Sequence, residues 1–209
     1  MQKCTKHFPY HGQTIMGSCG PACVVMAIKY LRPHLDVPRL FELTSWSRIW
    51  LFPFGATDEY GLSYLLASKD LNVEVFSRKP GIRFYPKSRL AHYFVSSFGE
   101  FMQYSYDLHR RIALSTGVKE KFQEVDSRLI LELLESGCVP IAMVDQSSYA
   151  PDDAFPDGIL HWVIVTKHNG VFHIHDPDIG PITLSREELE RGMDLHRNFG
   201  INSRIVSVC

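Results

Sequence analysis

The sequence predicts an α+β fold in which a helical N-terminal part packs on a C-terminal antiparallel sheet. Three observations predict it. A strongly apolar helical pattern lies near the N-terminus, at residues 18–31. Further helical patterns continue to about residue 135, and the last third contains short runs of β-branched and aromatic residues instead. Helices first and antiparallel strands afterwards are typical of α+β domains.

The first helix is predicted to begin near Ser18–Pro21 and to run to Leu31. Proline is tolerated in a first turn because its missing N–H would have no partner there. Residues 22–28 are apolar almost all round, so this helix should be central and buried. The pair Arg32–Pro33 ends it.

The middle of the chain gives weaker patterns. Residues 40–54 are aromatic-rich loop or helix pieces. The spacing of leucines predicts a helix over 60–69, and the alternation in 72–76 predicts a strand. Residues 127–135 are helical, with Gly137 as a natural stop.

The last third is predicted to form the sheet. Its strand-like runs are 139–144, 160–166, 170–175 and a short one at 182–184. The sequence His168-Asn169-Gly170 is a turn signal, so the second and third runs should form a hairpin. A helix is expected at 186–191, capped by Ser185.

Composition favours one globular domain over residues 1–209. The chain is 45% hydrophobic and 12% aromatic, which supports a sizeable core and excludes a disordered chain. With 22 basic and 23 acidic residues the net charge is -1, so no global field favours nucleic acid or an anionic membrane. No apolar run approaches the ~18 residues of a membrane span, and the first residues lack the apolar core of a secretory signal. We expect neither membrane nor nucleic acid as a partner.

The five cysteines suggest a location. They are Cys4, Cys19, Cys23, Cys138 and Cys209. Disulfide scaffolds use more cysteines in shorter chains, so a reducing cytoplasm is the default expectation.

Cys19 is the candidate nucleophile. It lies at the start of the predicted buried helix, where unbonded N–H groups and the helix dipole favour an anion. A thiolate is the nucleophilic form of cysteine. The alternative for an isolated cysteine is a small buried hydrophobe, and Cys23, among apolar neighbours, fits that alternative better.

Three more residues complete a candidate site. Gln13 precedes Cys19 by six residues, and its amide could join the Cys19 N–H as an oxyanion donor. His161 opens a strongly apolar strand and is the candidate base, although a structural core histidine is the alternative. If the predicted strands at 160–166 and 170–175 pair as a hairpin, Asp176, at the end of the second strand, lies beside His161 and can orient its ring.

The orienting carboxylate has three competitors. Asp178 lies beyond Pro177, where the chain has left the strand, and should be solvated. Asp145 ends a strand that nothing in the sequence places beside His161. Asp157 lies in a loop without rigid support. Asp176 is therefore preferred.

The order Gln13, Cys19, His161, Asp176 is that of papain-like cysteine peptidases. More narrowly, the chain resembles the bacteriocin-processing family, the double-glycine leader peptidases fused to some ABC exporters. The resemblance rests on Q-x5-C-G-P-A-C, on H-W-V-I-V followed by D-P, and on the stretches 13–31, 62–75, 129–144 and 161–177. It implies a papain-like fold with Cys19 as nucleophile, His161 as base, Asp176 as orienter and Gln13 as oxyanion donor.

The chain also departs from that family. We expect no attached exporter, Ser18 takes the place of the polar or acidic residue often found before the cysteine, and Arg78–Lys121 looks like an insertion, at about 78–125. This segment holds nine Lys or Arg against three acids, with eight Phe or Tyr between them. We expect it to flank the cleft and to select substrates; solvated helices with core aromatics, or a nucleic-acid surface, are the alternatives.

The hypothesis is a soluble, cytoplasmic cysteine hydrolase that cleaves a peptide or isopeptide bond without cofactor or metal. An acyl transferase on the same scaffold and a non-catalytic peptide-binding module are the alternatives. His173 and His175 share a strand face near Asp176, but no metal-binding spacing supports them.

Overall fold

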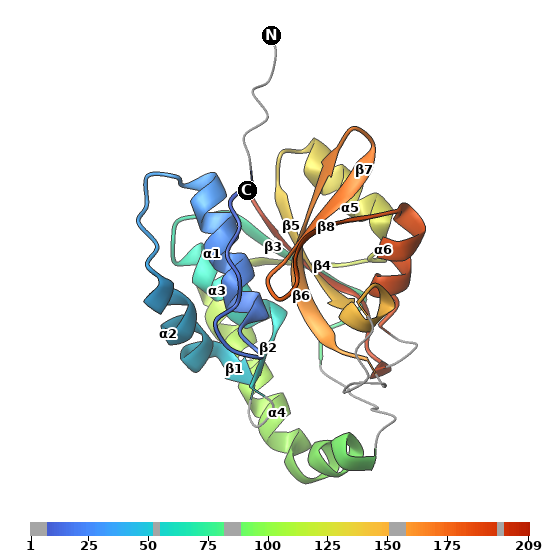
Figure 1. The fold of residues 1–209 in the computed structure, drawn as a ribbon. Coiled ribbons are helices and arrows are strands. Elements are labelled where there is room, and N and C mark those ends of the chain that lie inside the picture. The colour runs from blue at the N-terminus through green and yellow to red at the C-terminus, as the bar shows by residue number, and fades with distance from the viewer. Residues whose placement is uncertain (1–7, 52–54, 82–88, 151–157, 196–198) are drawn as a thin grey trace.

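The structure is a seven-stranded sheet between two layers of helices (Figure 1). The computed structural model describes residues 8–51, 55–81, 89–150, 158–195 and 199–209, the side chains of 89–95 excepted. The helices are α1 (Cys19–Leu31), α2 (Arg39–Ile49), α3 (Glu59–Ala67), α4 (Arg89–Ser115), α5 (Ser127–Glu135) and α6 (Arg186–Met193). The sheet strands are β3 (Val73–Ser77), β4 (Lys119–Phe122), β5 (Val139–Asp145), β6 (Leu160–His168), β7 (Val171–Asp176), β8 (Gly180–Leu184) and β9 (Arg204–Val208). A second, two-stranded sheet joins β1 (Trp50–Leu51) to β2 (Ala56–Thr57), and a 3-10 turn, η1 (Gln146–Ser148), follows β5.

Two hydrophobic cores lie on opposite faces of the large sheet. One contains α1, α3 and side chains such as Trp162 and Ile164; the other contains α5, α6 and the alternate side chains Val163 and Val165. Successive side chains of β6 therefore pack into opposite cores. The prediction of a buried first helix is confirmed, because every residue of α1 from Cys19 to Ile28 is buried.

The predicted β6–β7 hairpin is confirmed. The strands are antiparallel, Ile164 pairs with His175, and His168 pairs with Val171. The two turn residues, Asn169 and Gly170, have φ values of 49° and 83°. Positive φ at both turn positions is what Asn-Gly supplies in a two-residue hairpin. This turn fixes the register of the strands that carry His161 and Asp176.

The predicted helices around the sheet are confirmed to within a few residues. Ser185 caps α6 through a capping box with Glu188, and Asp126 caps α5. Asp58 caps α3 by accepting hydrogen bonds from the backbone N–H groups of Tyr60 and Gly61. The ambiguous stretch 40–54 includes α2 and β1 in its described part.

The sheet differs from the expected one in two strands. Its order is β4-β3-β9-β5-β6-β7-β8, so β9 joins the early strand β3 to the later strand β5. The strand β4 runs parallel to β3, which makes the sheet mixed rather than antiparallel. The sequence of β4, KEKF, is that of an exposed edge strand and carries no apolar alternation. The partners of β9 lie more than 60 residues away, beyond the reach of local pattern.

The basic segment Arg78–Lys121 contributes the helix α4 and the edge strand β4. Together with β3 they form a parallel crossover, and α4 packs against α3 and β1. Part of its charge is compensated locally by Arg78–Glu124, Arg110–Glu120 and Lys121–Glu74 ion pairs, at 2.7, 2.6 and 2.8 Å. Its expected role in substrate selection remains a prediction.

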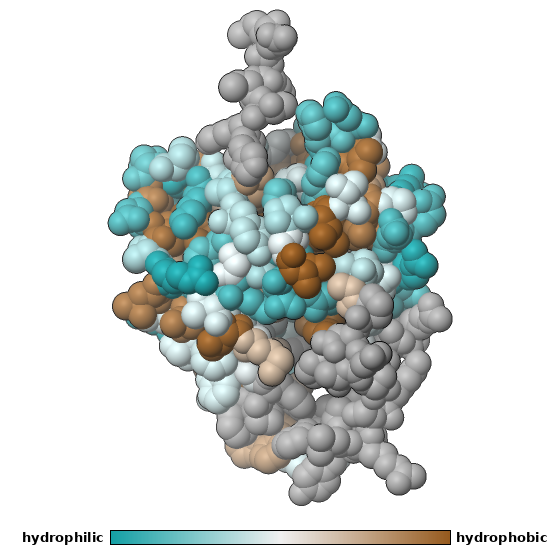
Figure 2. Space-filling model, in the orientation of Figure 1, coloured by the Kyte–Doolittle hydropathy of each residue, from teal (hydrophilic) through white to brown (hydrophobic). Residues whose placement is uncertain are grey.

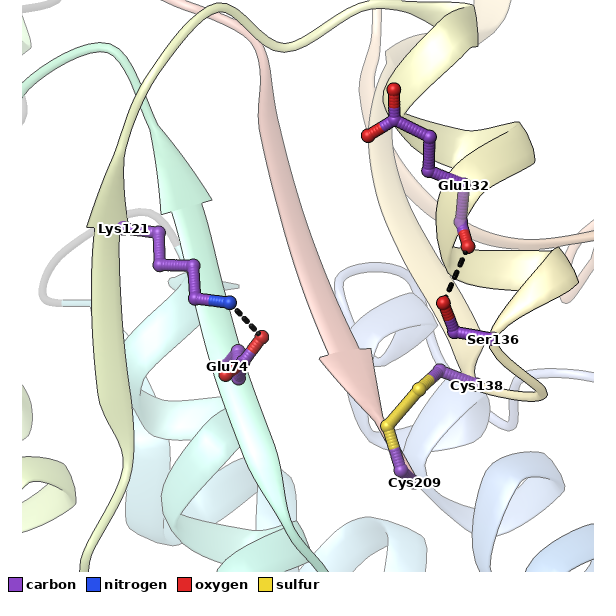
Figure 3. The surroundings of a disulfide bond; sticks show 6 residues. All are labelled: Glu74, Lys121, Glu132, Ser136, Cys138 and Cys209. Carbon is purple, nitrogen blue, oxygen red and sulfur yellow. Dashed lines mark hydrogen bonds and ion pairs between the residues drawn. A yellow bond between two sulfur atoms is a disulfide. The ribbon is translucent and has the colours of Figure 1, made fainter.

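A disulfide joins Cys138 to Cys209 (Figure 3). The bond connects the residues that flank a β5–β9 register pair, Val139 and Val208. It therefore clips the start of β5 to the end of β9. The number of cysteines favours a reducing compartment, yet structural disulfides are typical of oxidising compartments. The bond argues against that default, and the cytoplasmic location stays a prediction.

The helices of the described chain do not include one with the length and apolar content needed to cross a bilayer. On the face drawn in Figure 2, the described hydrophobic residues form small groups among hydrophilic ones. The larger exposed apolar side chains include Met16, Leu40 and Tyr104.

Candidate active site

Cys19 is the first residue of α1, and its side chain is 7% exposed. The chain enters the helix through a tight turn in which Gly17 has φ +89°. A Cβ at this glycine would lie 2.7 Å from the carbonyl oxygen of Gly55, so both the conformation and the close approach require glycine. The turn thereby places the thiol at the helix start, where unpaired N–H groups favour an anion.

A buried carboxylate holds the loop before the nucleophile. Glu42 of α2 is fully buried and accepts hydrogen bonds from the Thr14 N–H at 2.6 Å, the Thr14 hydroxyl at 2.8 Å and the Ser18 hydroxyl at 2.6 Å. Its second oxygen also lies 2.8 Å from Nε2 of His11. These bonds lower the pKa of Glu42 to about 2 against the opposing effect of burial. The segment carrying Gln13 and leading to Cys19 is therefore tied to α2.

His161 and Asp176 meet as the hairpin predicted. Nε2 of His161 lies 2.8 Å from Oδ1 of Asp176, and the two side chains are 5% and 0% exposed. Because Ile164 pairs with His175, His161 and Asp176 lie diagonally across the β6–β7 ladder. The backbone N–H groups of Asp178 and Ile179 also donate to Oδ1 of Asp176. The carboxylate is thus fixed by the turn that follows its strand.

The thiol, the imidazole and the carboxylate form one electrostatic unit. Burial opposes ionisation of Cys19, but the charge of His161, a hydrogen bond with that side chain and backbone hydrogen bonds to Trp162 and Gly20 outweigh it, so the pKa of Cys19 is lowered. Burial likewise disfavours the charged imidazole, but Cys19 and Asp176 raise the pKa of His161 to about 10. Because Nε2 of the ring faces Asp176, Nδ1 is left for the thiol. Both shifts favour the thiolate–imidazolium form of the pair.

This arrangement agrees with the comparison with known families. A family model described as "Peptidase_C39 like family" matches residues 8–197. The chain belongs to the peptidase C39-like family. The family match supports the resemblance to cysteine peptidases. It does not show a specific role in bacteriocin processing. No curated protein sequence matches the chain.

Gln13 of this C39-like chain lies at the Asp176 end of the site. Its backbone N–H donates to the carbonyl of Pro177 at 2.7 Å, and its side-chain Nε2 donates to Oδ1 of Asp178 at 2.8 Å. Its Oε1 is buried and has no hydrogen-bond partner among the residues that the structure describes. The amide nitrogen carries two hydrogens, so one remains available after the bond to Asp178. The oxyanion role of Gln13 stays a prediction.

The competing carboxylates have other partners. Asp145 does end a strand beside His161, because Val144 pairs with His161, and this corrects the sequence-based view. Its Oδ1, however, accepts bonds from Ser147 and from the Ile159 N–H. Asp157 lies outside the described residues. Asp178 is exposed as expected, but it is not free, since it accepts bonds from Gln13 and Gln146.

Two residues that the sequence analysis missed contact Asp176. The hydroxyl of Tyr149 donates to Oδ2 of Asp176 at 2.8 Å, and Nε2 of Gln146 donates to Oδ2 of both Asp176, at 3.4 Å, and Asp178, at 3.2 Å. Burial, followed by the negative charge of Asp176, raises the pKa of Tyr149, so the phenol stays a neutral donor. The signal that could have found them is the run QSSY directly after the strand that pairs with β6.

Cys23 and the histidines of β7 have structural surroundings. The thiol of Cys23 is fully buried and donates to the carbonyl of Trp162 at 3.2 Å, and burial raises its pKa well above the ordinary value. His175 lies 3.0 Å from the Thr166 hydroxyl, and its ring lies against that of Phe8 at a tilt of 35°. Within the described chain, no three His, Cys, Asp or Glu side chains are grouped as metal ligands.

Proposed function

We propose that this chain is a cysteine peptidase in which Cys19 attacks the carbonyl of a peptide or isopeptide bond. The observation that carries the proposal is the continuous link from the Cys19 thiol through His161 to Asp176, with the pKa of the thiol lowered and that of the imidazole raised. A structural cysteine at a helix start needs neither shift. Membership of the C39-like family supports the same chemistry.

The acylation half of the reaction follows from the ion pair. The Cys19 thiolate forms a C–S bond to the carbonyl carbon, and the carbonyl oxygen becomes an oxyanion. The Cys19 N–H and the free hydrogen of the Gln13 amide would donate to that oxygen. As the C–N bond breaks, the leaving amine takes the proton of imidazolium His161. A thioester and a neutral imidazole remain.

Deacylation returns the enzyme to its starting state. Neutral His161 takes a proton from water while the hydroxide adds to the thioester carbon. The new intermediate collapses by breaking the C–S bond, which releases the acid product and restores thiolate and imidazolium. Asp176 stays ionised throughout, since its hydrogen bond and charge interaction with His161 lower its pKa against the effect of burial. It holds the ring and stabilises the imidazolium.

The proposal is tested by cleavage of a mixture of unstructured peptides, with products identified by mass spectrometry. The wild-type chain should cleave, and Cys19→Ala should not, while both give the same far-UV circular dichroism. Cys23→Ala is the matched control, because its thiol is buried, has a raised pKa and should leave cleavage intact. Equal cleavage by wild type and Cys19→Ala would overturn the proposal. Adding a primary amine distinguishes the transferase alternative, which predicts an amide product in place of the acid.

A further inference from the structure

A small pocket is lined in part by Cys19, and the proposed mechanism assigns it no role. It has a volume of about 70 Å³ and is bounded by the turn before α1, by β1 and β2, and by residues of β5, β6 and β9. Its apolar walls are Leu51, Met143, Leu160, Trp162 and Ile201, with Ala56 at the β2 side. The pocket is therefore continuous with the candidate nucleophile.

The acidic residues that border the pocket already have partners in the fold. Glu59 pairs with Arg204 and accepts a hydrogen bond from the Tyr106 hydroxyl at 2.8 Å. Asp58 accepts two backbone hydrogen bonds at the start of α3 and lies 2.5 Å from Nδ1 of His109. These contacts face α3 and α4, behind the pocket. A ligand in the pocket therefore meets mainly apolar walls, with the hydroxyl of Thr57 among them, and no unpaired charge among the described residues.

The volume limits what fits. A water molecule needs about 10–15 Å³ measured in this way, so 70 Å³ holds about five to seven atoms of that size. The three or four carbons of a valine, leucine or isoleucine side chain fit, whereas the seven carbons of a phenylalanine side chain, each larger than a water molecule, exceed this space. A substrate glycine has no side chain to cover the apolar walls, which would stay in contact with water. Binding of glycine therefore lacks the favourable free energy of burying these walls.

The position of His161 decides which half of the substrate lies there. His161 must protonate the leaving amine, so the amine half lies next to its ring. Both neighbours of His161 in β6, Leu160 and Trp162, line the pocket, whereas His161 itself does not. The acyl half, which stays bound to Cys19 as the thioester, is left to occupy it. One residue spans at most about 3.6 Å of chain, so a pocket that Cys19 itself lines is within reach of the first two acyl residues.

We propose that this pocket binds one aliphatic side chain of the acyl half of the substrate, at the residue that supplies the scissile carbonyl or the one before it. The inference rests on the proposed function, and it names a substrate class for it: chains with valine, leucine or isoleucine at that position, rather than glycine or an aromatic residue. The helix α4 then contributes to specificity indirectly, by holding Asp58 and Glu59 behind the pocket.

The test is covalent labelling of Cys19 by N-acetyl tripeptidyl acyloxymethyl ketones. The last or the preceding residue is varied among Gly, Val, Leu and Phe, with Ala elsewhere, and each rate is divided by the rate with iodoacetamide. At one of the two positions, Val or Leu should label at least about tenfold faster than Gly, and Phe should be no faster than Gly. Mass spectrometry identifies the modified residue.

Variants locate the preference. Ala56→Leu fills the pocket from β2 and should abolish the preference for Val and Leu. Ala67→Leu, a similarly half-buried alanine of α3 away from the pocket, is the matched control and should keep it. Leu160→Ala enlarges the pocket and should raise the Phe rate relative to Val. Equal rates for all four residues with a reactive Cys19, or a preference that survives Ala56→Leu, would overturn the pocket assignment alone. A Cys19 that iodoacetamide does not modify selectively would overturn the proposed function and the pocket assignment with it.

Discussion

Cys19 and His161 shift each other's pKa inside a buried site, and their charge state should control reactivity. The pKa of Cys19 is lowered and that of His161 is raised to about 10, and both shifts favour the thiolate–imidazolium pair. Iodoacetamide should therefore alkylate Cys19 at a lower pH than an ordinary thiol. As the pH rises through about 10, His161 loses its proton, and peptide cleavage should fall.

The control for this pH profile is His161→Ala. Without the imidazolium, burial is left as the main influence and should move the alkylation profile of Cys19 to higher pH. Alkylation rates measured against pH for both chains check this. An unchanged profile in His161→Ala would show that the ion pair is not the cause.

Substitution of either Asp176 or Asp178 should lower cleavage activity, and the loss should be larger for Asp176. Asp176→Asn should lower cleavage by one or more orders of magnitude, because the neutral amide no longer stabilises imidazolium His161. From sequence alone Asp178→Asn would be nearly silent, but Asp178 accepts the Gln13 amide. We now expect a smaller loss of kcat that leaves the alkylation profile of Cys19 unmoved. Cleavage kinetics and alkylation of both folded variants test this; the reverse ranking would contradict it.

Gln13→Ala should lower kcat about 10²–10³-fold, the usual loss for one oxyanion donor. KM should change little, because the hydrogen bond belongs mainly to the transition state. Steady-state kinetics on one peptide give both constants. An unaltered kcat would remove Gln13 from the site.

The candidate triad could be predicted because its parts are tied to local signals. Cys19 follows a helix-start pattern, and Asn169-Gly170 fixes a hairpin that brings Asp176 to His161. The contacts of Gln146 and Tyr149 with Asp176 could not be predicted in this way. They depend on β5 lying beside β6, a pairing set by packing between segments that are not joined by a tight turn.

At the scale of elements, Glu42 links α2 to the loop before α1. Its pKa falls from 4.5 to about 2 on folding, so the charged form stabilises the folded state above pH 4.5, and this contribution is lost as the pH falls toward 2. Glu42→Gln should lower the free energy of unfolding at neutral pH by about 3 kcal/mol. Urea unfolding at several pH values measures this.

The matched control is Glu132→Gln. Glu132 lies on the exposed side of α5, and its removal should change stability by less than about 0.5 kcal/mol. If both variants lose the same stability at neutral pH, Glu42 does not hold the loop. Glu42→Gln should also slow alkylation of Cys19 because the turn that positions it is released.

Strong local patterns predicted most helices and the hairpin, and weak ones failed at the edge and centre of the sheet. The structure confirms the predicted cap Ser185 at the start of α6 and the predicted stop at Gly137 after α5. The strands β4 and β9 were missed for opposite reasons: β4 is polar and exposed, while β9 is fully buried but pairs with residues far away in sequence.

At the scale of the whole molecule, the Cys138–Cys209 disulfide closes a loop with a sequence separation of 71 residues. Restricting the unfolded chain in this way stabilises a fold by about 2–4 kcal/mol. The double variant Cys138→Ser, Cys209→Ser should lose that much free energy of unfolding. A reductant should destabilise the wild type to a similar extent and leave the double variant unaffected. Identical unfolding curves for wild type and double variant would contradict this.

The central position of β9 also bears on when the molecule can assemble during its synthesis. No backbone hydrogen bond of the described sheet joins β3 and β4 to β5–β8 without β9. Arg204, which begins β9, follows Asp176 by 28 residues. At about 5–20 residues per second a ribosome needs about one to six seconds for that interval. A nascent chain therefore carries all three candidate triad residues for some seconds before its sheet can close. The fold can therefore be completed only after β9 has been synthesised, which is after synthesis of Cys19, His161 and Asp176.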